Sequence, residues 1–127
     1  MADPNIVNVT SIIGTTYVQA VLTSPTAIVT GVASKVIKIN ALYVGNIDPA
    51  ASYKITVDLF RGSVAYNILY QVSIPAGAGL DVLSNSIYIQ EADTLRLTAD
   101  TVSKLQAVAS GEVINYCVRA MVELLVR

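Results

Sequence analysis

The sequence predicts an all-β domain in which two antiparallel sheets pack face to face as a β-sandwich of seven to nine strands. Its 127 residues include 18 Val, 13 Ile and 10 Thr but only 3 Glu and 4 Lys. Such a composition fits pleated sheet and lacks the usual residues of helix surfaces. Apolar and polar residues alternate in several segments, and turn signals recur about every eight to twelve residues. These patterns are typical of a sandwich or barrel with little helix.

No linker, charge block, low-complexity tract or internal repeat divides the chain. A chain of this length can bury a core without disulfides or metals. We therefore expect a single domain over residues 1–127, with residues 1–14 as a candidate extended N-terminal arm.

In the N-terminal half, the expected strands are Thr15–Leu22, Lys35–Gly45 and Tyr53–Arg61. The last of these, YKITVDLFR, alternates most clearly, since Ile55, Val57 and Leu59 share one face and polar residues occupy the other. This alternation indicates a strand with one buried face.

A hairpin is expected at Gly62-Ser63, a two-residue break whose leading glycine suits the positive φ of such turns. The remaining expected strands are Val64–Ile74, Leu80–Leu83, Ile87–Ile89, Leu95–Thr98, Leu105–Ser110 and residues 118–126, where alternation favours a strand over a helix. The PAGAG segment at Pro75–Gly79 has the glycines of a phosphate-binding loop, but a strand-like segment follows it instead of a helix. We expect it to form a turn.

The N-terminal quarter of the chain is uncharged from Pro4 to Ser34. One interpretation is that it forms two inner strands of the sandwich. The other is that part of this arm lies on a partner subunit, because monomers rarely leave large apolar surfaces in water. On the second interpretation, the arm and the C-terminal strand supply the candidate subunit or capsid interface, whose residues are Ile6, Ile12, Ile13, Tyr17, Met121 and Leu125.

The composition also excludes several kinds of chemistry. The chain has no His and no Trp, and Cys117 is its only cysteine. We expect no enzymatic activity, no cofactor and no metal site, since the usual general base and commonest metal ligand is missing. A net charge of −1 provides no field for nucleic acid or an anionic membrane, and we exclude both as main partners.

Two sets of side chains remain to be interpreted. Glu91 and Asp93 could place two carboxylates on one side of a turn, but no further acidic residues nearby complete a cation site, so we expect a solvated turn. The seven tyrosines could stack on sugars, but they are scattered over different segments. Core, edge and subunit contacts explain them more simply.

Five phrases, in order, resemble a known group of proteins. They are INALYVGNID (Ile39–Asp48), YKITVDLFR (Tyr53–Arg61), IPAGAGLDVL (Ile74–Leu83), IQEADTLRLTA (Ile89–Ala99) and LQAVASGEVI (Leu105–Ile114). Together they are similar to small virion structural proteins of tailed bacteriophages, of the capsid decoration or cement type. The resemblance implies a β-sandwich of jelly-roll type that assembles on the particle, often as trimers, without a cofactor or enzymatic activity.

The sequence thus leads us to expect a phage capsid decoration or cement protein that stabilises contacts between major capsid subunits. Its partners would be further copies of itself, with a trimer as the first expectation, and the major capsid protein or another virion protein. It would be made in the host bacterial cytoplasm, since the N-terminus lacks a secretory signal, and would be located in the virion. The alternatives are a neck or tail component and a host-glycan-binding module.

Overall fold

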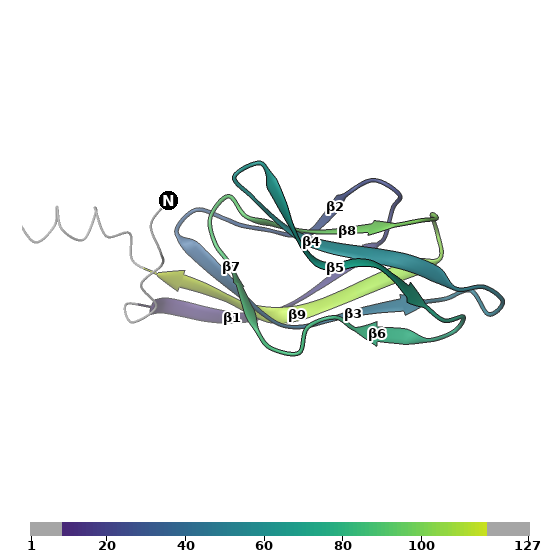
Figure 1. The fold of residues 1–127 in the computed structure, drawn as a ribbon. Coiled ribbons are helices and arrows are strands. Elements are labelled where there is room, and N and C mark those ends of the chain that lie inside the picture. Colours follow the sequence, from purple (N-terminus) through teal and green to yellow (C-terminus); the bar gives the residue numbers. More distant parts are fainter. Residues whose placement is uncertain (1–8, 117–127) are drawn as a thin grey trace, which may run out of the picture.

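Two antiparallel sheets pack against each other in the computed structural model, which describes residues 9–116 (Figure 1). These residues form nine strands and no helix, which confirms the expected all-β class. The strands are β1 (Val9–Ala20), β2 (Thr26–Thr30), β3 (Lys35–Asn46), β4 (Tyr53–Arg61), β5 (Val64–Ile74), β6 (Gly79–Asp81), β7 (Ile87–Ile89), β8 (Thr94–Ala99) and β9 (Leu105–Tyr116).

Strands that are distant in the sequence are neighbours in both sheets. The first sheet has the order β1-β9-β3-β6, and β7 also pairs with β3. Since β6 pairs with Tyr43–Gly45 and β7 with Ile37–Ile39, the two short strands share one edge of β3. The second sheet has the order β2-β8-β4-β5. The first strand of the fold therefore lies beside the last.

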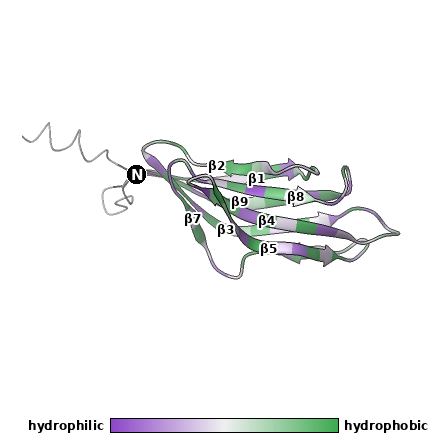
Figure 2. Ribbon diagram, turned by 45° about the horizontal axis from the view of Figure 1, so that its top comes forward, coloured by the Kyte–Doolittle hydropathy of each residue, from purple (hydrophilic) through white to green (hydrophobic). Residues whose placement is uncertain are grey.

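The core lies between the sheets and follows the alternation of the strands. In β8, Leu95, Leu97 and Ala99 are buried while the residues between them are partly exposed. Figure 2 shows this change of hydropathy from one residue to the next along β4 and β8. Fully buried side chains come from both sheets and include Ile39, Leu42 and Leu105 of the first sheet and Ile55, Leu95 and Leu97 of the second.

The two turns expected from the sequence are present. Arg61 pairs with Val64 across Gly62 and Ser63, whose φ values are 58° and 63°. Both values are positive, as a type I′ hairpin turn requires. Residues 75–78 turn into β6, a strand, and not into a helix.

Several strand boundaries differ from those expected. β1 begins at Val9 instead of Thr15, and β9 continues past Ser110 to Tyr116, because these two segments pair with each other. Of the candidate arm at residues 1–14, residues 9–14 therefore belong to a strand. Residues 1–8 and the strand expected at 118–126 lie outside the described residues.

Candidate functional site

The outward side of the first sheet carries a row of exposed apolar side chains. Val18 of β1 pairs with Val108 of β9, which pairs in turn with Tyr43 of β3. Their exposed fractions are 73%, 41% and 52%, respectively. The residues that alternate with them, such as Leu42 and Ala109, are buried in the core, so the row points away from it.

The rows on either side consist of small or uncharged residues. Thr16, Ser110 and Ala41 form one of these rows, and Ala20, Gln106 and Gly45 form the other. Together with the central row they make a surface of nine residues on three strands, which we call the uncharged face: Thr16, Val18, Ala20, Ala41, Tyr43, Gly45, Gln106, Val108 and Ser110. Small side chains beside two valines and a tyrosine leave this surface accessible to a partner.

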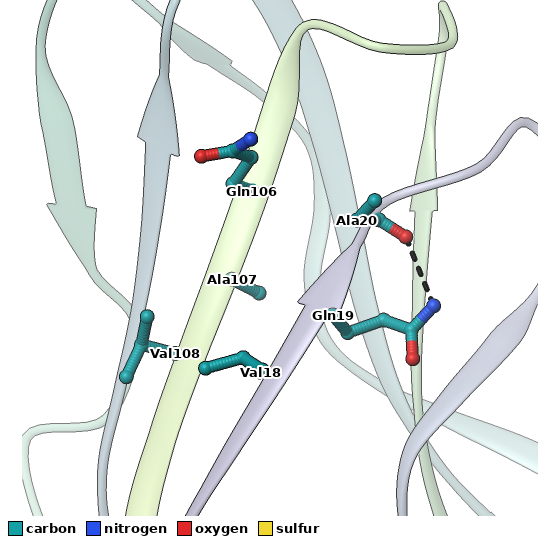
Figure 3. Close-up of a pocket in the computed structure, with 6 residues that line it drawn as sticks. All are labelled: Val18, Gln19, Ala20, Gln106, Ala107 and Val108. Carbon is teal, nitrogen blue, oxygen red and sulfur yellow. Dashed lines mark hydrogen bonds between the residues drawn. The ribbon is translucent and has the colours of Figure 1, made fainter.

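An open hollow lies on β1 and β9 within this surface. It is lined by Val18, Gln19, Ala20, Gln106, Ala107 and Val108 (Figure 3). The Gln19 amide donates a hydrogen bond to the carbonyl oxygen of Ala20, 3.0 Å away. The lining contains no charged or titratable side chain. It can therefore bury apolar surface but has no group suited to acid–base or nucleophilic chemistry.

The outward side of the second sheet differs because an ion pair lies across β8 and β4. Arg96 of β8 donates two hydrogen bonds to Asp58 of β4, at 2.9 and 3.1 Å. The same guanidinium lies 4.0 Å from the centre of the Phe60 ring, a cation–π contact. Contact with a partner would have to desolvate or break this arrangement. The nine residues of the uncharged face carry no such cost, and the exposed Asp81 of β6, which pairs with Tyr43, lies at the border of this face.

The structure places the predicted interface residues in different environments. Ile12 and Ile13 of β1 are exposed, at 57% and 54%. Ile12 lies on the same side of the sheet as Val18, six residues earlier in β1. Tyr17 lies on the opposite side of β1 and packs against the core, where partial burial raises the pKa of its hydroxyl. Ile6, Met121 and Leu125 lie outside the described residues.

Sequence reasoning did not single out Val18, Tyr43 and Val108. Each is one exposed residue within an alternating strand, and no local pattern distinguishes it from other exposed apolar residues. Only the pairing of β1, β9 and β3 brings the three together.

The turn that carries Glu91 and Asp93 is not the solvated turn we expected. Asp93 is fully buried and accepts two hydrogen bonds from Arg61, at 2.7 and 2.5 Å, and a third from the backbone N–H of Gln90. Glu91 is engaged elsewhere, since it accepts the backbone N–H of Ser34. The expectation was wrong because the partner of Asp93 comes from the end of β4, far away in the sequence.

Asp93 acts as a structural anchor for this turn. Burial alone would raise the pKa of its carboxyl, but the hydrogen bonds from Arg61 and Gln90 and the charge of Arg61 outweigh burial and lower the pKa. The ionised carboxylate is therefore the form that the fold stabilises. Within residues 9–116, no group of three or more acidic, Cys or His residues is placed to hold a metal ion.

Comparison of the chain with known protein families, curated proteins and solved structures found no match. Across the described part of the chain, no helix is long and apolar enough to cross a membrane.

Proposed function

We propose that the chain is a structural subunit of a phage virion, and that it is a capsid decoration or cement protein that stabilises contacts between major capsid subunits. The observation that carries this proposal is the uncharged face. The fully buried centre of a protein interface is depleted of charge and contains aromatic residues. Val18, Val108 and Tyr43, with a row of uncharged residues on each side, have this character.

The order of the strands supports a jelly roll, the fold that the resemblance implies. β1 pairs with β9, β2 with β8, β3 with both β6 and β7, and β4 with β5. When β6 and β7 are counted as one interrupted strand, the fold has eight strands. The first then pairs with the eighth, the second with the seventh, the third with the sixth and the fourth with the fifth. Eight strands paired in this nested way make two four-stranded sheets, and viral capsid proteins are among the proteins built on this plan.

Attachment would depend on several copies acting together. A nine-residue face is a small footprint, so a single copy would bind weakly. Linked copies bind together with an avidity that exceeds the single contact by orders of magnitude. We propose self-association with three copies in a ring as the first arrangement to test. Support comes from β1, an uncharged strand at the edge of its sheet, because such edges readily pair with another chain.

A neck or tail component is the second candidate within the virion. The same uncharged face would then contact a neighbouring ring of subunits in place of the capsid lattice. The location of the chain on the particle separates the two candidates.

Binding to particles that lack the chain tests the proposal. Purified Val18→Lys and Val108→Lys proteins are mixed with particles of the encoding phage from which this gene has been deleted, and co-sedimentation is measured. Val64→Lys is the matched control, because Val64 is similarly exposed, at 48%, but lies on β5 of the other sheet. We expect at least about tenfold weaker binding for the two face variants, since a charge is buried at the contact.

The control should bind as the parent protein does. Unchanged binding of both face variants, with correct folding shown by circular dichroism, would overturn the uncharged face as the docking surface. Absence of binding by the parent protein itself would overturn the virion proposal.

A further inference from the structure

A bulge in β5 places two consecutive side chains on the outward side of the second sheet. Leu69 pairs with Val57, and Val72 pairs with Ile55. Tyr70 and Gln71 of β5 therefore lie together opposite one residue of β4, Thr56. Leu69 and Val72 both pack against the core. The two residues between them are exposed, Tyr70 at 66%.

The conformation of this bulge is held by a specific hydrogen bond. Gln71 has a φ of 50°, which is uncommon for a residue other than glycine. Its backbone N–H donates to the hydroxyl of Thr56, 3.1 Å away. Thr56 in turn pairs with Thr98 of β8, so a hydroxyl-rich row runs from the bulge across the sheet.

An open hollow lies along this row. It is lined by Lys54, Thr56, Gln71, Thr98, Ala99 and Asp100. The carboxylate of Asp100 accepts the backbone N–H of Lys54 at 3.2 Å, which fixes the acidic end of the hollow. The lining therefore combines two hydroxyls, one amide, one carboxylate and one ammonium group, and its charges sum to zero.

We infer that this hollow binds a neutral sugar, with Tyr70 beside it as a stacking surface. Hydroxyl and amide groups both donate and accept hydrogen bonds, as the hydroxyls of a sugar do. The exposed tyrosine ring offers an apolar face for the C–H side of a pyranose. A phosphate or another anion is disfavoured because Asp100 offsets the one cation, and an apolar ligand would leave the hydroxyl, amide and carboxylate groups of the lining without hydrogen-bond partners.

The site lies on the sheet opposite the uncharged face. A subunit attached to a particle through the uncharged face would keep the hollow open to solvent and to a cell surface. The inference does not rest on the proposed function, because the sugar would bind the isolated chain as well.

Titration of the isotope-labelled full chain, followed by ¹H–¹⁵N NMR, tests the inference. The probes are glucose, galactose, mannose, rhamnose and N-acetylglucosamine, each added to about 50 mM, a range that covers the weak binding expected of a small open site. Sialic acid, which is charged, is added in the same way. We expect saturable shifts for at least one neutral sugar, confined to the amides around Thr56, Gln71 and Thr98.

Three variants and one control sharpen the test. Tyr70→Ala removes the stacking ring, Thr98→Val replaces a hydroxyl by a methyl group, and Gln71→Gly removes the amide while tolerating the positive φ. Each should weaken binding at least about tenfold. Tyr66→Ala is the matched control, since Tyr66 is exposed at 56% on the same strand but pairs with Leu59 and, unlike Tyr70, is not next to a residue that lines the hollow; it should bind as the parent does.

The inference is overturned if no neutral sugar gives a saturable shift at these amides, if sialic acid alone binds, or if Tyr70→Ala binds as tightly as Tyr66→Ala. The dispersed amide spectrum of each variant reports in the same experiment whether it is folded. Particle binding through the other face is measured separately, so a failure here leaves the proposed function untouched.

Discussion

Replacing Gly111 with alanine should destabilise the protein strongly, because β3 and β9 approach each other closely at this position. Gly111 is buried opposite Ile39, and a Cβ built on it would lie 2.0 Å from the carbonyl oxygen of Lys38. Carbon and oxygen in ordinary contact are about 3.3 Å or more apart. The obstructing atom belongs to the backbone and cannot rotate away, so β3 would have to move by about 1 Å.

The cost follows from that movement. Overpacking of this kind costs about 1–3 kcal/mol, and each interstrand hydrogen bond stretched out of range adds about 1 kcal/mol. We therefore expect a loss of about 3–4 kcal/mol, a large part of the roughly 5–15 kcal/mol that stabilises a typical domain.

Urea unfolding followed by circular dichroism measures this loss. With a slope of about 1.5–2 kcal/mol per molar urea, the midpoint should fall by about 2 M. Gly14→Ala is the control, since Gly14 lies on the exposed side of β1 and nothing is within 4 Å of its added Cβ. That variant should stay within about 0.5 kcal/mol of the parent. Equal midpoints for the two variants, or a Gly111→Ala loss below about 1 kcal/mol, would show that β3 does not approach β9 closely enough at Gly111 to exclude a side chain.

Three further predictions concern buried polar groups. Arg61→Met should lower the free energy of unfolding by about 3–5 kcal/mol, because it leaves the buried carboxylate of Asp93 without its ion pair. Asp93→Asn should lower it by only about 1–3 kcal/mol, because the Arg61 side chain, 43% exposed, still reaches water. Equal urea midpoints for the two variants would contradict this order. Since folding lowers the pKa of Asp93, its contribution is present above the unfolded pKa of about 3.9 and is lost as the pH falls through the lower folded value. Unfolding free energies at pH 5 and pH 2 should therefore differ less in Asp93→Asn than in the parent, and an equal difference would show that Asp93 is not the titrating group. Asn46→Asp should lower the free energy of unfolding by about 2–4 kcal/mol at pH 7 in the same urea assay. The Asn46 amide donates hydrogen bonds to the carbonyl oxygens of Ala51 and Ile74, and a carboxylate cannot donate them. An unchanged midpoint would contradict this role of Asn46.

Strands with regular alternation and tight turns were the predictable part of the fold. β4 has the bounds expected from its alternation, and the Gly62-Ser63 hairpin lies where its glycine indicated. β2 did not stand out because Ile28 and Val29 are consecutive and both buried, and its register with β8 shifts at this point. In a strand of five residues, one such irregularity is enough to hide the alternation of apolar and polar residues that predicts a strand.

The candidate surface was much less predictable than the strands. Val18, Val108 and Tyr43 come from three strands whose adjacency depends on pairing between the two ends of the chain. Likewise, the ion-pair partner of Asp93 is Arg61, which lies at the end of β4, far from Asp93 in the sequence. Local composition shows that residues 5–34 carry no charge, but it does not show which side of the strand faces solvent.

We propose that the uncharged face attaches this chain to a virion. Electron cryo-microscopy of particles purified from the encoding phage is the decisive experiment, because the two-sheet domain can be placed in the density. We expect one copy or a ring of copies on the outside of the capsid, with Val18, Val108 and Tyr43 in contact with the major capsid protein. Absence of the chain from the particles, or density in which the side of the second sheet carrying Asp58 and Arg96 faces the capsid, would contradict it.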